Sequence, residues 1–331
     1  MTNTYSTAAI RTAGGHRNGQ LPAQLDGLRL PAISAPMFLT SNPDLVVEVC
    51  RSGLVGTFPA LNLRTTEALD EWLSEIKERL GRYESAAPYG INLIVNKSND
   101  RLEADLDMVV KHKVPLVITS LGAASSVVDA VHSYGGLVFH DVINLRHAQK
   151  AAEVGVDGII AVCAGAGGHG GLLNPFALIP EIRAFFDGVI ILSGSISTGA
   201  QIAAAEVMGA DLAYLGTRFI ATQEAMASQD NKDMILQSAA SDIMYTPKIS
   251  GVNANFLRPS IEAAGVDPDK LADVEDFQPA EQKKQAWKDI WSAGQGVGSI
   301  HDIPTAAELC ERLIEEYDAA LLAATKKRAR R

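Results

Sequence analysis

Residues 163–171 hold the pattern in this sequence that is most suggestive of chemistry. They read CAGAGGHGG, so five glycines surround one histidine, His169. The glycines allow positive φ angles and a close approach of the backbone to a ligand. An imidazole has an unperturbed pKa close to neutrality, which suits it to proton transfer at physiological pH. We therefore expect His169 to act as a catalytic acid/base; the alternative is a flexible surface loop with an incidental histidine.

Two later segments are rich in small and hydroxyl-bearing residues, SGSIS at 193–197 and GTRF at 216–219. Each follows a short apolar run. In (β/α)8 barrels the loops after strands seven and eight commonly hold a phosphate on backbone N–H groups. Either segment alone would be an ordinary tight turn, but the pair predicts one phosphate site. No GxGxxG motif opens a helix after a strand, so no Rossmann-type dinucleotide site is predicted.

A scaffold must position these segments, and the alternation of elements along the chain indicates which one. Short apolar runs alternate with helix-length stretches from about residue 30 onward. Such alternation predicts parallel strands, because parallel neighbours need a crossover connection. Continuous apolar runs such as VIIL indicate strands buried on both faces. The eight predicted strands are 30–37, 54–58, 90–95, 115–120, 137–142, 158–162, 189–193 and 212–216.

Eight such units within about 190 residues favour a closed α/β barrel of the TIM type over an open doubly wound sheet, which is the alternative topology. Asn42 is expected to cap the first helix, with Pro43 at its first position. The predicted helices between the strands include 43–53, 65–80, 99–112, 124–134, 145–154 and 198–208.

The last helix of the barrel does not follow the eighth strand at once. Residues 223–285 contain two helical stretches, a turn-rich YTPKISGVNAN segment and the acidic DPDKLADVEDFQ. We interpret 223–285 as a small, mostly helical substrate-side subdomain inserted into a barrel formed by 1–222 and 286–331. A glycine-rich turn at 293–298 and a closing helix at 305–322 complete the barrel.

The composition argues against several classes of protein. The chain has 331 residues, 47% of them hydrophobic, and a formal net charge of −10. A nucleic-acid binder is not expected, since affinity for the phosphate backbone needs clustered cations. The basic cluster at 326–331 predicts a solvated tail.

The sequence also predicts the cellular compartment of the protein and whether it binds a metal. The three cysteines are far apart, which predicts neither a disulfide framework nor a zinc site and suits a reducing compartment. The N-terminus has no secretory pattern, and no apolar stretch approaches the roughly 18 residues of a membrane span. A cytoplasmic location without membrane association is therefore expected. No HxxxH-type cluster is present, so no metal is assigned.

The chain resembles the nitronate monooxygenase family, formerly called 2-nitropropane dioxygenases, from about Pro31 to the final helix. AGGH and GTRF together are specific for this group of flavin barrels, which also includes NADH:quinone reductases and FMN-dependent enoyl-acyl-carrier reductases. The matching segments are APM at 35–37, GINL at 90–93, AGGHGG at 166–171, SGSIS at 193–197, LGTRFIAT at 215–222, SGVNANFLR at 250–258 and WSAGQGVG at 291–298.

This resemblance implies an FMN-dependent monooxygenase whose substrates are a nitronate and O2 and whose products are a carbonyl compound and nitrite. His169 would face the substrate and would also deprotonate a neutral nitroalkane if one is accepted. Asp141 stands where some relatives have a lysine, so tuning of the flavin by a lysine does not carry over. The implied cofactor-binding residues are Pro36, Met37, Asn92, Asp141, Gly167, Gly168, Ser193, Gly194, Ser195, Gly216 and Thr217.

Two other functions remain as alternatives. The first is an NAD(P)H-dependent FMN reductase of quinones or enoyl thioesters, and the second is a non-catalytic flavin-binding or interaction protein. The oligomeric state is left open, with a homodimer among the arrangements considered.

Three further features of the sequence each lead to a separate expectation. His140, on the fifth predicted strand, is either a second polar group of the active site or a packed, hydrogen-bonded strand histidine. Cys163 is expected to be a small buried hydrophobe rather than a reactive thiol. The segment 250–258 is expected to form part of the wall over the flavin, near the barrel mouth, because an insertion after strand eight emerges on the carboxyl face.

Overall fold

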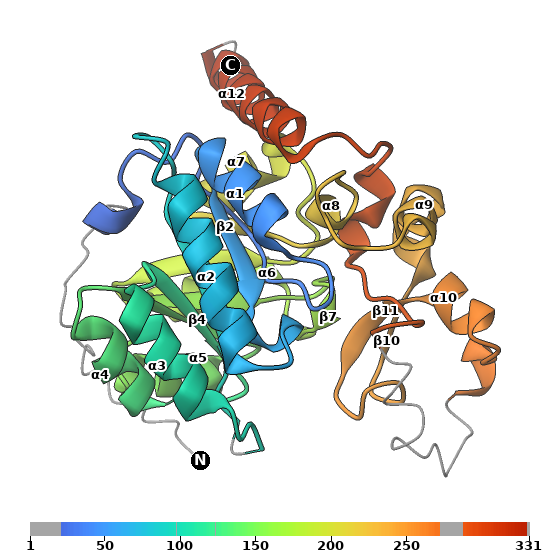
Figure 1. The fold of residues 1–331 in the computed structure, drawn as a ribbon. Helices are drawn as coiled ribbons and strands as arrows, with labels where there is room; N and C mark the ends of the chain where they lie inside the picture. Colours follow the sequence, from blue (N-terminus) through green and yellow to red (C-terminus); the bar gives the residue numbers. More distant parts are fainter. Residues whose placement is uncertain (1–20, 97, 123, 272–286, 330–331) are drawn as a thin grey trace, which may run out of the picture.

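Eight parallel strands form a closed barrel in the computed structural model (Figure 1), which describes residues 21–96, 98–122, 124–271 and 287–329. The strands follow one another around the barrel in chain order, and β1 pairs with both β2 and β9. This closure confirms the barrel and excludes the open sheet. The strands are β1 (Ala32–Ser34), β2 (Val55–Pro59), β3 (Tyr89–Ile94), β4 (Leu116–Ser120), β5 (Leu137–Val142), β6 (Gly158–Val162), β8 (Val189–Ser193) and β9 (Leu212–Leu215).

Helices cover the outside of the barrel and connect its strands. Local capping fixes where several of them begin. The Asn42 side chain accepts a hydrogen bond from the Leu45 backbone N–H, and Pro43 occupies the first turn, as predicted. The outer helices are α1 (Pro43–Arg51), α2 (Thr66–Leu80), α3 (Leu102–His112), α4 (Ser125–His132), α5 (Leu145–Glu153), α6 (Pro175–Arg183), α7 (Gly199–Val207) and α12 (Ala306–Ala329).

The strands divide their side chains between two cores, because successive residues of a strand point to opposite faces. On β5, Val138 and Val142 join the larger core between the strands and the helices. Leu137 and Phe139 instead join the core inside the barrel. The residue that follows in this inward series is Asp141, at the carboxyl end of the strand. The same alternation on the other strands brings their last inward-facing side chains together at one end of the barrel.

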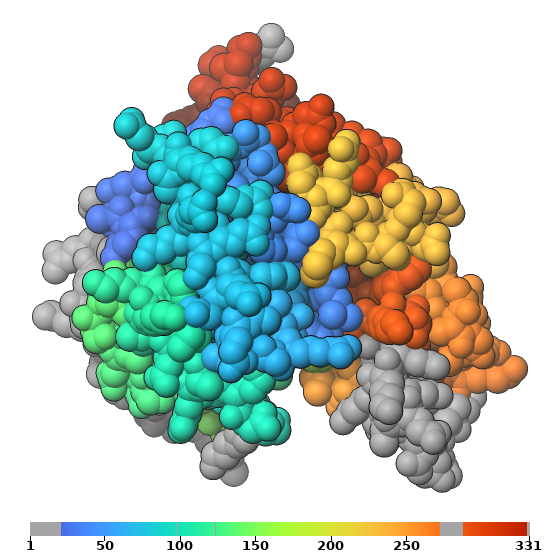
Figure 2. All heavy atoms as spheres, in the orientation of Figure 1, coloured from blue at the N-terminus to red at the C-terminus, as the bar shows by residue number. Residues whose placement is uncertain are grey.

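The insertion after β9 lies to one side of the barrel and appears in Figure 2 as a separate lobe in yellow and orange. The described residues of 223–285 include helices α9 and α10, where the sequence indicated two helical stretches, and also two strands that the sequence analysis did not identify. These strands form an antiparallel sheet with β7, which belongs to the histidine loop of the barrel. The elements are α8 (Thr217–Ile220), α9 (Gln229–Gln237), β10 (Ile243–Thr246), β11 (Ala254–Leu257), α10 (Arg258–Ala263) and β7 (Gly168–His169).

The closing helix α12 packs against α7 and α1 and so completes the ring of helices. Its approach to α7 requires a glycine at residue 199. A Cβ atom there would lie 2.1 Å from the carbonyl oxygen of Leu313. The predicted helix 305–322 is therefore the barrel's last helix, and it extends further, to Ala329.

Some predictions fall wholly or partly outside the described residues. These are the absence of a secretory pattern within 1–20, the part of the acidic stretch from 272 onward, and the last two residues of the basic cluster. Lys326, Lys327 and Arg328 form the exposed last turn of α12. The division of the chain into 1–222 with 286–331 and 223–285 stays a prediction. Among the described helices, none is both long enough and apolar enough to cross a membrane.

Candidate active site

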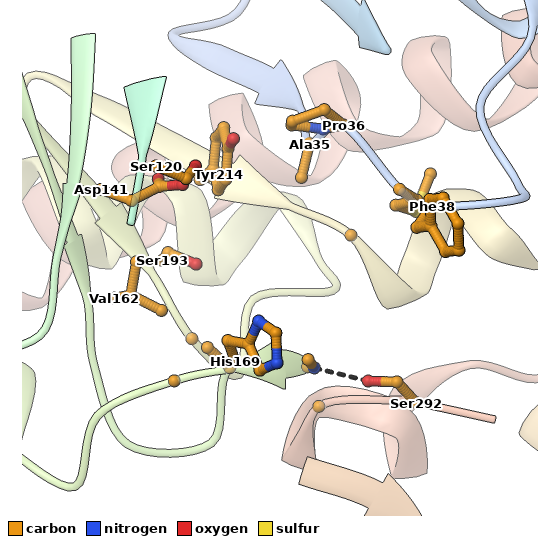
Figure 3. Close-up of a pocket in the computed structure, with 18 of the residues that line it drawn as sticks. Ala35, Pro36, Phe38, Ser120, Asp141, Val162, His169, Ser193, Tyr214 and Ser292 are labelled. Carbon is orange, nitrogen blue, oxygen red and sulfur yellow. Dashed lines mark hydrogen bonds between the residues drawn. The ribbon is translucent and has the colours of Figure 1, made fainter. Parts of the chain in front are cut away.

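A cavity of about 1060 Å³ opens at the carboxyl ends of the barrel strands. Its volume lies at the upper end of the range of roughly 300–1000 Å³ that is usual for small-molecule sites. Figure 3 shows several of its lining residues. The structure brings together in this cavity all the residues assigned to the site from sequence: Pro36, Met37, Asn92, Asp141, Gly167, Gly168, His169, Ser193, Gly194, Ser195, Gly216 and Thr217.

Part of the cavity floor is polar and is formed by inward-facing residues near the carboxyl ends of β3, β4 and β5. The Asn92 side chain on β3 donates from Nδ2 to Ser120 Oγ on β4, at 2.7 Å. Ser120 Oγ in turn donates to Asp141 Oδ2 on β5. Burial raises the pKa of Asp141 to about 6, and the bond from Ser120 opposes that shift. The floor therefore contains a carboxyl group that titrates near neutral pH.

His169 lies on a different wall of the cavity from Asp141 and Ser120 (Figure 3). It belongs to β7 and is paired in register with Ala254 of the insertion. Its ring makes an edge-on contact with Trp287, with the ring centroids 5.3 Å apart. The side chain is open to the cavity, and desolvation lowers its pKa. The imidazole is thus held in place and is mainly neutral at pH 7, as a base must be.

The glycine-rich loop around His169 is clamped by the insertion and by the segment that follows it. Asn255 Nδ2 donates to the carbonyl oxygen of Ala166 at 2.6 Å. The hydroxyl of Tyr245 donates to the carbonyl oxygen of Gly170 at 2.9 Å. Ser292 Oγ accepts the backbone N–H of Gly168. Three polar contacts at alternate residues therefore hold the loop, so the flexible-loop alternative does not describe this structure.

The turn after β8 has the geometry of an anion site. Gly194 and Ser195 have φ angles of 131° and 58°, in the left-handed half of conformational space. Consecutive N–H groups in such a turn can point into a shared concavity that attracts anions. Within the described residues, the N–H groups of Gly194 and Ser195 have no protein acceptor. Both residues line the cavity, where a phosphate would satisfy these donors.

The turn after β9 supplies the other side of the predicted phosphate site. A Cβ atom built on Gly216 would meet nothing closer than Ala35 Cβ, at 3.8 Å. A Cβ at residue 216 would therefore make only ordinary van der Waals contacts, with Ala35 and Met37, and all three residues line the cavity. Thr217 Oγ1 accepts the backbone N–H of Gly294 at 2.8 Å, which leaves its own hydroxyl hydrogen free to donate to a ligand.

The glycine-rich turn at 293–298 belongs to the site, which the sequence analysis missed. Gly294 and Gly296 line the cavity. A Cβ on Gly294 would lie 2.5 Å from the carbonyl oxygen of Gly165, and one on Gly167 would lie 2.9 Å from the N of Gly294. These glycines are needed so that two loops can pack backbone to backbone. The repeated glycines of WSAGQGVG were the available signal.

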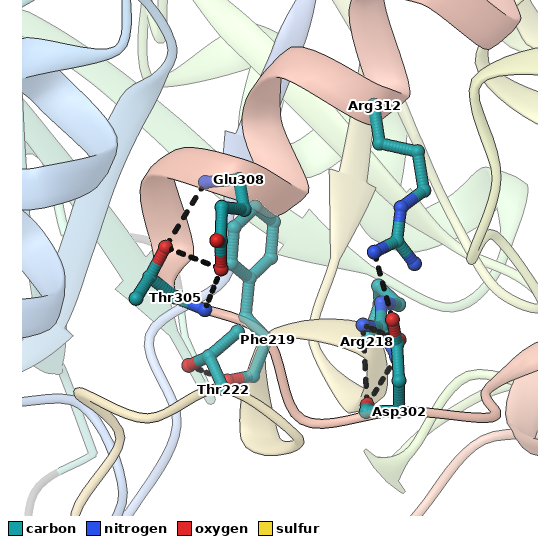
Figure 4. Close-up of polar contacts among 7 residues, drawn as sticks. All are labelled: Arg218, Phe219, Thr222, Asp302, Thr305, Glu308 and Arg312. Atoms are coloured by element: carbon teal, nitrogen blue, oxygen red, sulfur yellow. Dashed lines mark hydrogen bonds and ion pairs between the residues drawn. The ribbon is translucent and has the colours of Figure 1, made fainter.

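Arg218 of the GTRF segment is turned away from the cavity and supports the site from behind. Its side chain is 3% exposed and forms an ion pair with Asp302 at 2.9 Å. Figure 4 shows this pair together with Arg312, which also binds Asp302. The contact joins the turn after β9 to the chain that enters α12. Arg218 is therefore a structural residue of the site.

The structure shows how His140 is held on its strand. Its side chain is buried, and Nδ1 lies 2.7 Å from Thr119 Oγ1. Burial and the nearby His147 lower its pKa to about 4. It is the packed, hydrogen-bonded strand histidine, although part of it reaches the cavity wall. Cys163 is fully buried and its pKa is raised to about 12 by burial, as expected of an inert thiol.

Comparisons with known proteins agree with this geometry. The family model described as nitronate monooxygenase matches residues 100–316. The nitronate monooxygenase of Paraburkholderia phytofirmans is 29% identical over 283 residues, covering 73% of this chain and 77% of that protein. A solved structure of nitroalkane oxidase from Streptomyces ansochromogenes has a TM-score of 0.76 and 24% identity, covering 92% of this chain and 100% of that one; this likeness concerns the fold.

A further relative has a different named activity. The (3aS,4S,5R,7aS)-5-hydroxy-7a-methyl-1-oxo-octahydro-1H-indene-4-carboxyl-CoA dehydrogenase of Rhodococcus jostii is 24% identical over 229 residues. The alignment covers 69% of this chain and 63% of that protein.

Proposed function

The chain belongs to the nitronate monooxygenase family of flavin-dependent oxidoreductases, and on that basis we propose that it binds FMN and oxidises alkyl nitronates. In the proposed reaction a nitronate and O2 give a carbonyl compound and nitrite, with His169 as the acid/base. The observation that carries this proposal is the shape of one cavity. A concave turn of free N–H groups lies at one side, a polar floor lies beneath, and the neutral imidazole of His169 faces the same space.

The residues present fit FMN better than a cofactor without a phosphate. The N–H groups of Gly194 and Ser195, the hydroxyl of Thr217 and the lack of a side chain at Gly216 would form a cradle for one phosphate. Met37 and Asn92 line the cavity beyond that cradle, where a ring system would lie. Bound there, FMN would supply the chemistry that no side chain of this protein has, the transfer of electrons from the substrate to O2.

The protein's own contribution is to bind and orient the substrate and to move a proton. A nitronate carries a negative charge and needs no deprotonation, so His169 would serve it as a hydrogen-bonding partner. A neutral nitroalkane must first lose its α-proton, and the neutral imidazole of His169 would accept it. The lowered pKa of His169 keeps this base available down to slightly acidic pH. The clamp on its loop keeps the ring oriented.

A second candidate function is an NAD(P)H-dependent reductase of quinones or enoyl thioesters. The cavity volume favours it, because about 1060 Å³ offers more room than a small nitroalkane needs beside a flavin. The Rhodococcus jostii relative is named as a carboxyl-CoA dehydrogenase, so the substrate in its name is also a thioester. The alternative of a non-catalytic flavin protein is weakened by the clamped histidine.

Anaerobic stopped-flow mixing separates the two enzymes. Purified protein containing flavin is mixed in parallel with an alkyl nitronate, with NADH and with NADPH, and bleaching of the flavin absorbance is followed. Rapid bleaching by the nitronate alone supports the monooxygenase. Rapid bleaching by a reduced nicotinamide, with none by the nitronate, overturns it in favour of the reductase. Mass spectrometry of the heat-released cofactor tests the assignment of FMN, and recovery of FAD would contradict it.

A further inference from the structure

The carboxyl group of Asp141 occupies an unusual position on the cavity floor. Two hydrogen bonds end at this carboxyl group. Asn92 donates to Ser120 Oγ, and Ser120 Oγ donates to Asp141 Oδ2. Its other oxygen, Oδ1, is buried and has no hydrogen-bond partner among the described residues. The residue lines the cavity. A buried polar atom without a partner is costly, so such an atom at a ligand site indicates a group that the ligand completes.

A second unpartnered atom lies near the first. The hydroxyl of Tyr214, on β9, is also buried without a partner in the described part of the chain. Figure 3 shows Tyr214, Ser120 and Asp141 grouped together on the floor. Burial, and then the negative charge of Asp141, raise the pKa of Tyr214 well above its usual value. Tyr214 therefore stays neutral and cannot compensate the charge of an ionised Asp141.

In the part of the chain that the structure describes, no cation lies close enough to neutralise Asp141. Within the described residues it forms no ion pair with Lys, Arg or His at 4.0 Å or less. On β4 its neighbour is Ser120, and on β6 the residue that ends the strand is the apolar Val162. His140, next to it in sequence, points to the opposite face of β5 and binds Thr119. The other titratable residues that line the cavity are His140, His147, Lys150, His169, Tyr214 and Tyr245.

We propose that Asp141 binds the ring system of FMN as a protonated carboxylic acid that donates a hydrogen bond from Oδ1. The proposal rests on the proposed function, since it requires FMN in this cavity. The edge of the oxidised ring presents mainly acceptor atoms, two carbonyl oxygens and unprotonated nitrogens. A neutral acid complements these acceptors, whereas a carboxylate would repel them. Reduction of the flavin adds negative charge, which a neutral acid tolerates and an anion opposes.

Because protonation of Asp141 and binding of FMN are coupled, this role can be measured without following turnover. In the protein without FMN, Asp141 has a pKa of about 6, so it is largely protonated below pH 6 and largely ionised above it. If only the protonated form donates to FMN, the affinity falls as the pH rises above 6, because each binding event must then include uptake of a proton. Asp141→Asn supplies a donor of the same shape that does not titrate in this range. The affinity of the Asp141→Asn variant for FMN should therefore not show the fall above pH 6 that titration of Asp141 causes in the wild type.

The test measures the dissociation constant of FMN from the apoprotein between pH 5.5 and 8.5 by flavin fluorescence. The phosphate of FMN also titrates near pH 6, but it does so equally with both proteins. The ratio of the wild-type constant to the Asp141→Asn constant therefore isolates residue 141. We expect this ratio to rise at least about tenfold between pH 6 and pH 8. The exposed-site variant Asp187→Asn should retain the wild-type pH dependence.

Three outcomes would overturn the proposal. A ratio that stays constant with pH shows that Asp141 does not titrate against FMN. A ratio that falls with pH shows that the ionised carboxylate is the binding form and accepts a hydrogen bond from the ring. Loss of FMN binding by the wild-type apoprotein at every pH, with its circular dichroism spectrum unchanged, removes the cofactor assignment itself. The first two results leave the proposed function intact.

Discussion

Asn255, in the insertion, donates a hydrogen bond at 2.6 Å to the carbonyl oxygen of Ala166, three residues before His169. The side chain is 3% exposed, so the bond is made in a dry environment. Pairing of β11 with β7 aligns the two segments, placing Asn255 opposite Gly168. The insertion and the histidine loop are thus one structural unit, although 89 residues separate the two partners in sequence.

Asn255→Ala should therefore destabilise the protein by about 1–3 kcal/mol, because it leaves a buried carbonyl without a donor. Chemical unfolding measures the loss, and amide hydrogen exchange of 163–171 should become faster. Asn253→Ala is the control, since Asn253 lines the cavity but is exposed. Equal stability and equal exchange in the two variants would contradict the clamp.

His169→Ala should keep the fold and FMN, because the predicted phosphate cradle lies in other loops. Turnover of neutral nitroalkanes should fall by about 10²–10⁴-fold, the usual contribution of a positioned base. Turnover of pre-formed nitronates should fall less, since they need no proton removal. Steady-state rates with both substrate forms measure the difference. Equal losses would make His169 a binding residue, and no loss with either would place the active site elsewhere.

Gly216→Leu should lower the affinity for FMN without unfolding the protein. A Cβ at residue 216 makes only ordinary van der Waals contacts, the nearest at 3.8 Å, and the residue lines the cavity, so the longer side chain should occupy space that the phosphate needs. The φ angle of Gly216 is −101°, which any residue adopts. We expect at least about tenfold weaker binding, equivalent to about 1.4 kcal/mol, measured by fluorescence titration of the apoprotein. Gly298→Leu, at an exposed position of the glycine-rich turn, should bind FMN normally. Unchanged FMN binding by Gly216→Leu would contradict the assignment of the phosphate site to this turn.

The rim of the cavity predicts a preference for long substrates. Four apolar side chains line the cavity and are also exposed: Phe38, Leu121, Ile143 and Val252. The value of kcat/KM for primary nitronates should rise with chain length by up to about fourfold per methylene, as burial of about 0.8 kcal/mol each implies. Ile143→Asn should flatten this dependence, whereas Val207→Asn, at an exposed position on α7, should not. A chain-length series that is flat in the wild type would contradict the prediction.

Asp302→Asn should weaken the link between the turn after β9 and α12. Arg312 and Arg218 lower the pKa of Asp302 from its usual 3.8, the hydrogen bond from Arg312 being the largest cause. A depressed pKa means that the ionised form stabilises the fold above pH 4 and that this contribution is lost as the pH falls through the folded-state pKa. Asp302 is 43% exposed, so the expected loss at pH 7 is only about 0.5–1 kcal/mol.

Chemical unfolding of the wild type and of Asp302→Asn at pH 7 and at pH 3 tests whether the stabilisation by Asp302 is lost as the pH falls. The difference in unfolding free energy between the two proteins should shrink at pH 3. Asp187→Asn provides the control at an exposed carboxylate. A difference that grows as the pH falls would show that Asp302 does not stabilise the protein through its charge.

The sequence by itself determined the order of the elements and the location of the candidate site. Apolar runs buried on both faces, alternating with capped helices, are local patterns that predict a parallel α/β fold. The glycines around His169 and the paired small-residue turns mark the carboxyl ends of strands β6, β8 and β9. The structure places all of these segments on one cavity.

The tertiary structure alone decided how the site is held. Strand β7 has only two residues, too few for any periodic pattern, and it exists because β11 pairs with it. The need for glycine at 294 arises from the backbone of residue 165, which is distant in sequence. The chain of bonds from Asn92 through Ser120 to Asp141 joins three neighbouring strands, and Asn92 reaches two residues along β4 beyond its register partner Ile118. Such contacts depend on the lateral pairing of β3, β4 and β5, whose residues are distant in sequence, so no local pattern predicts them.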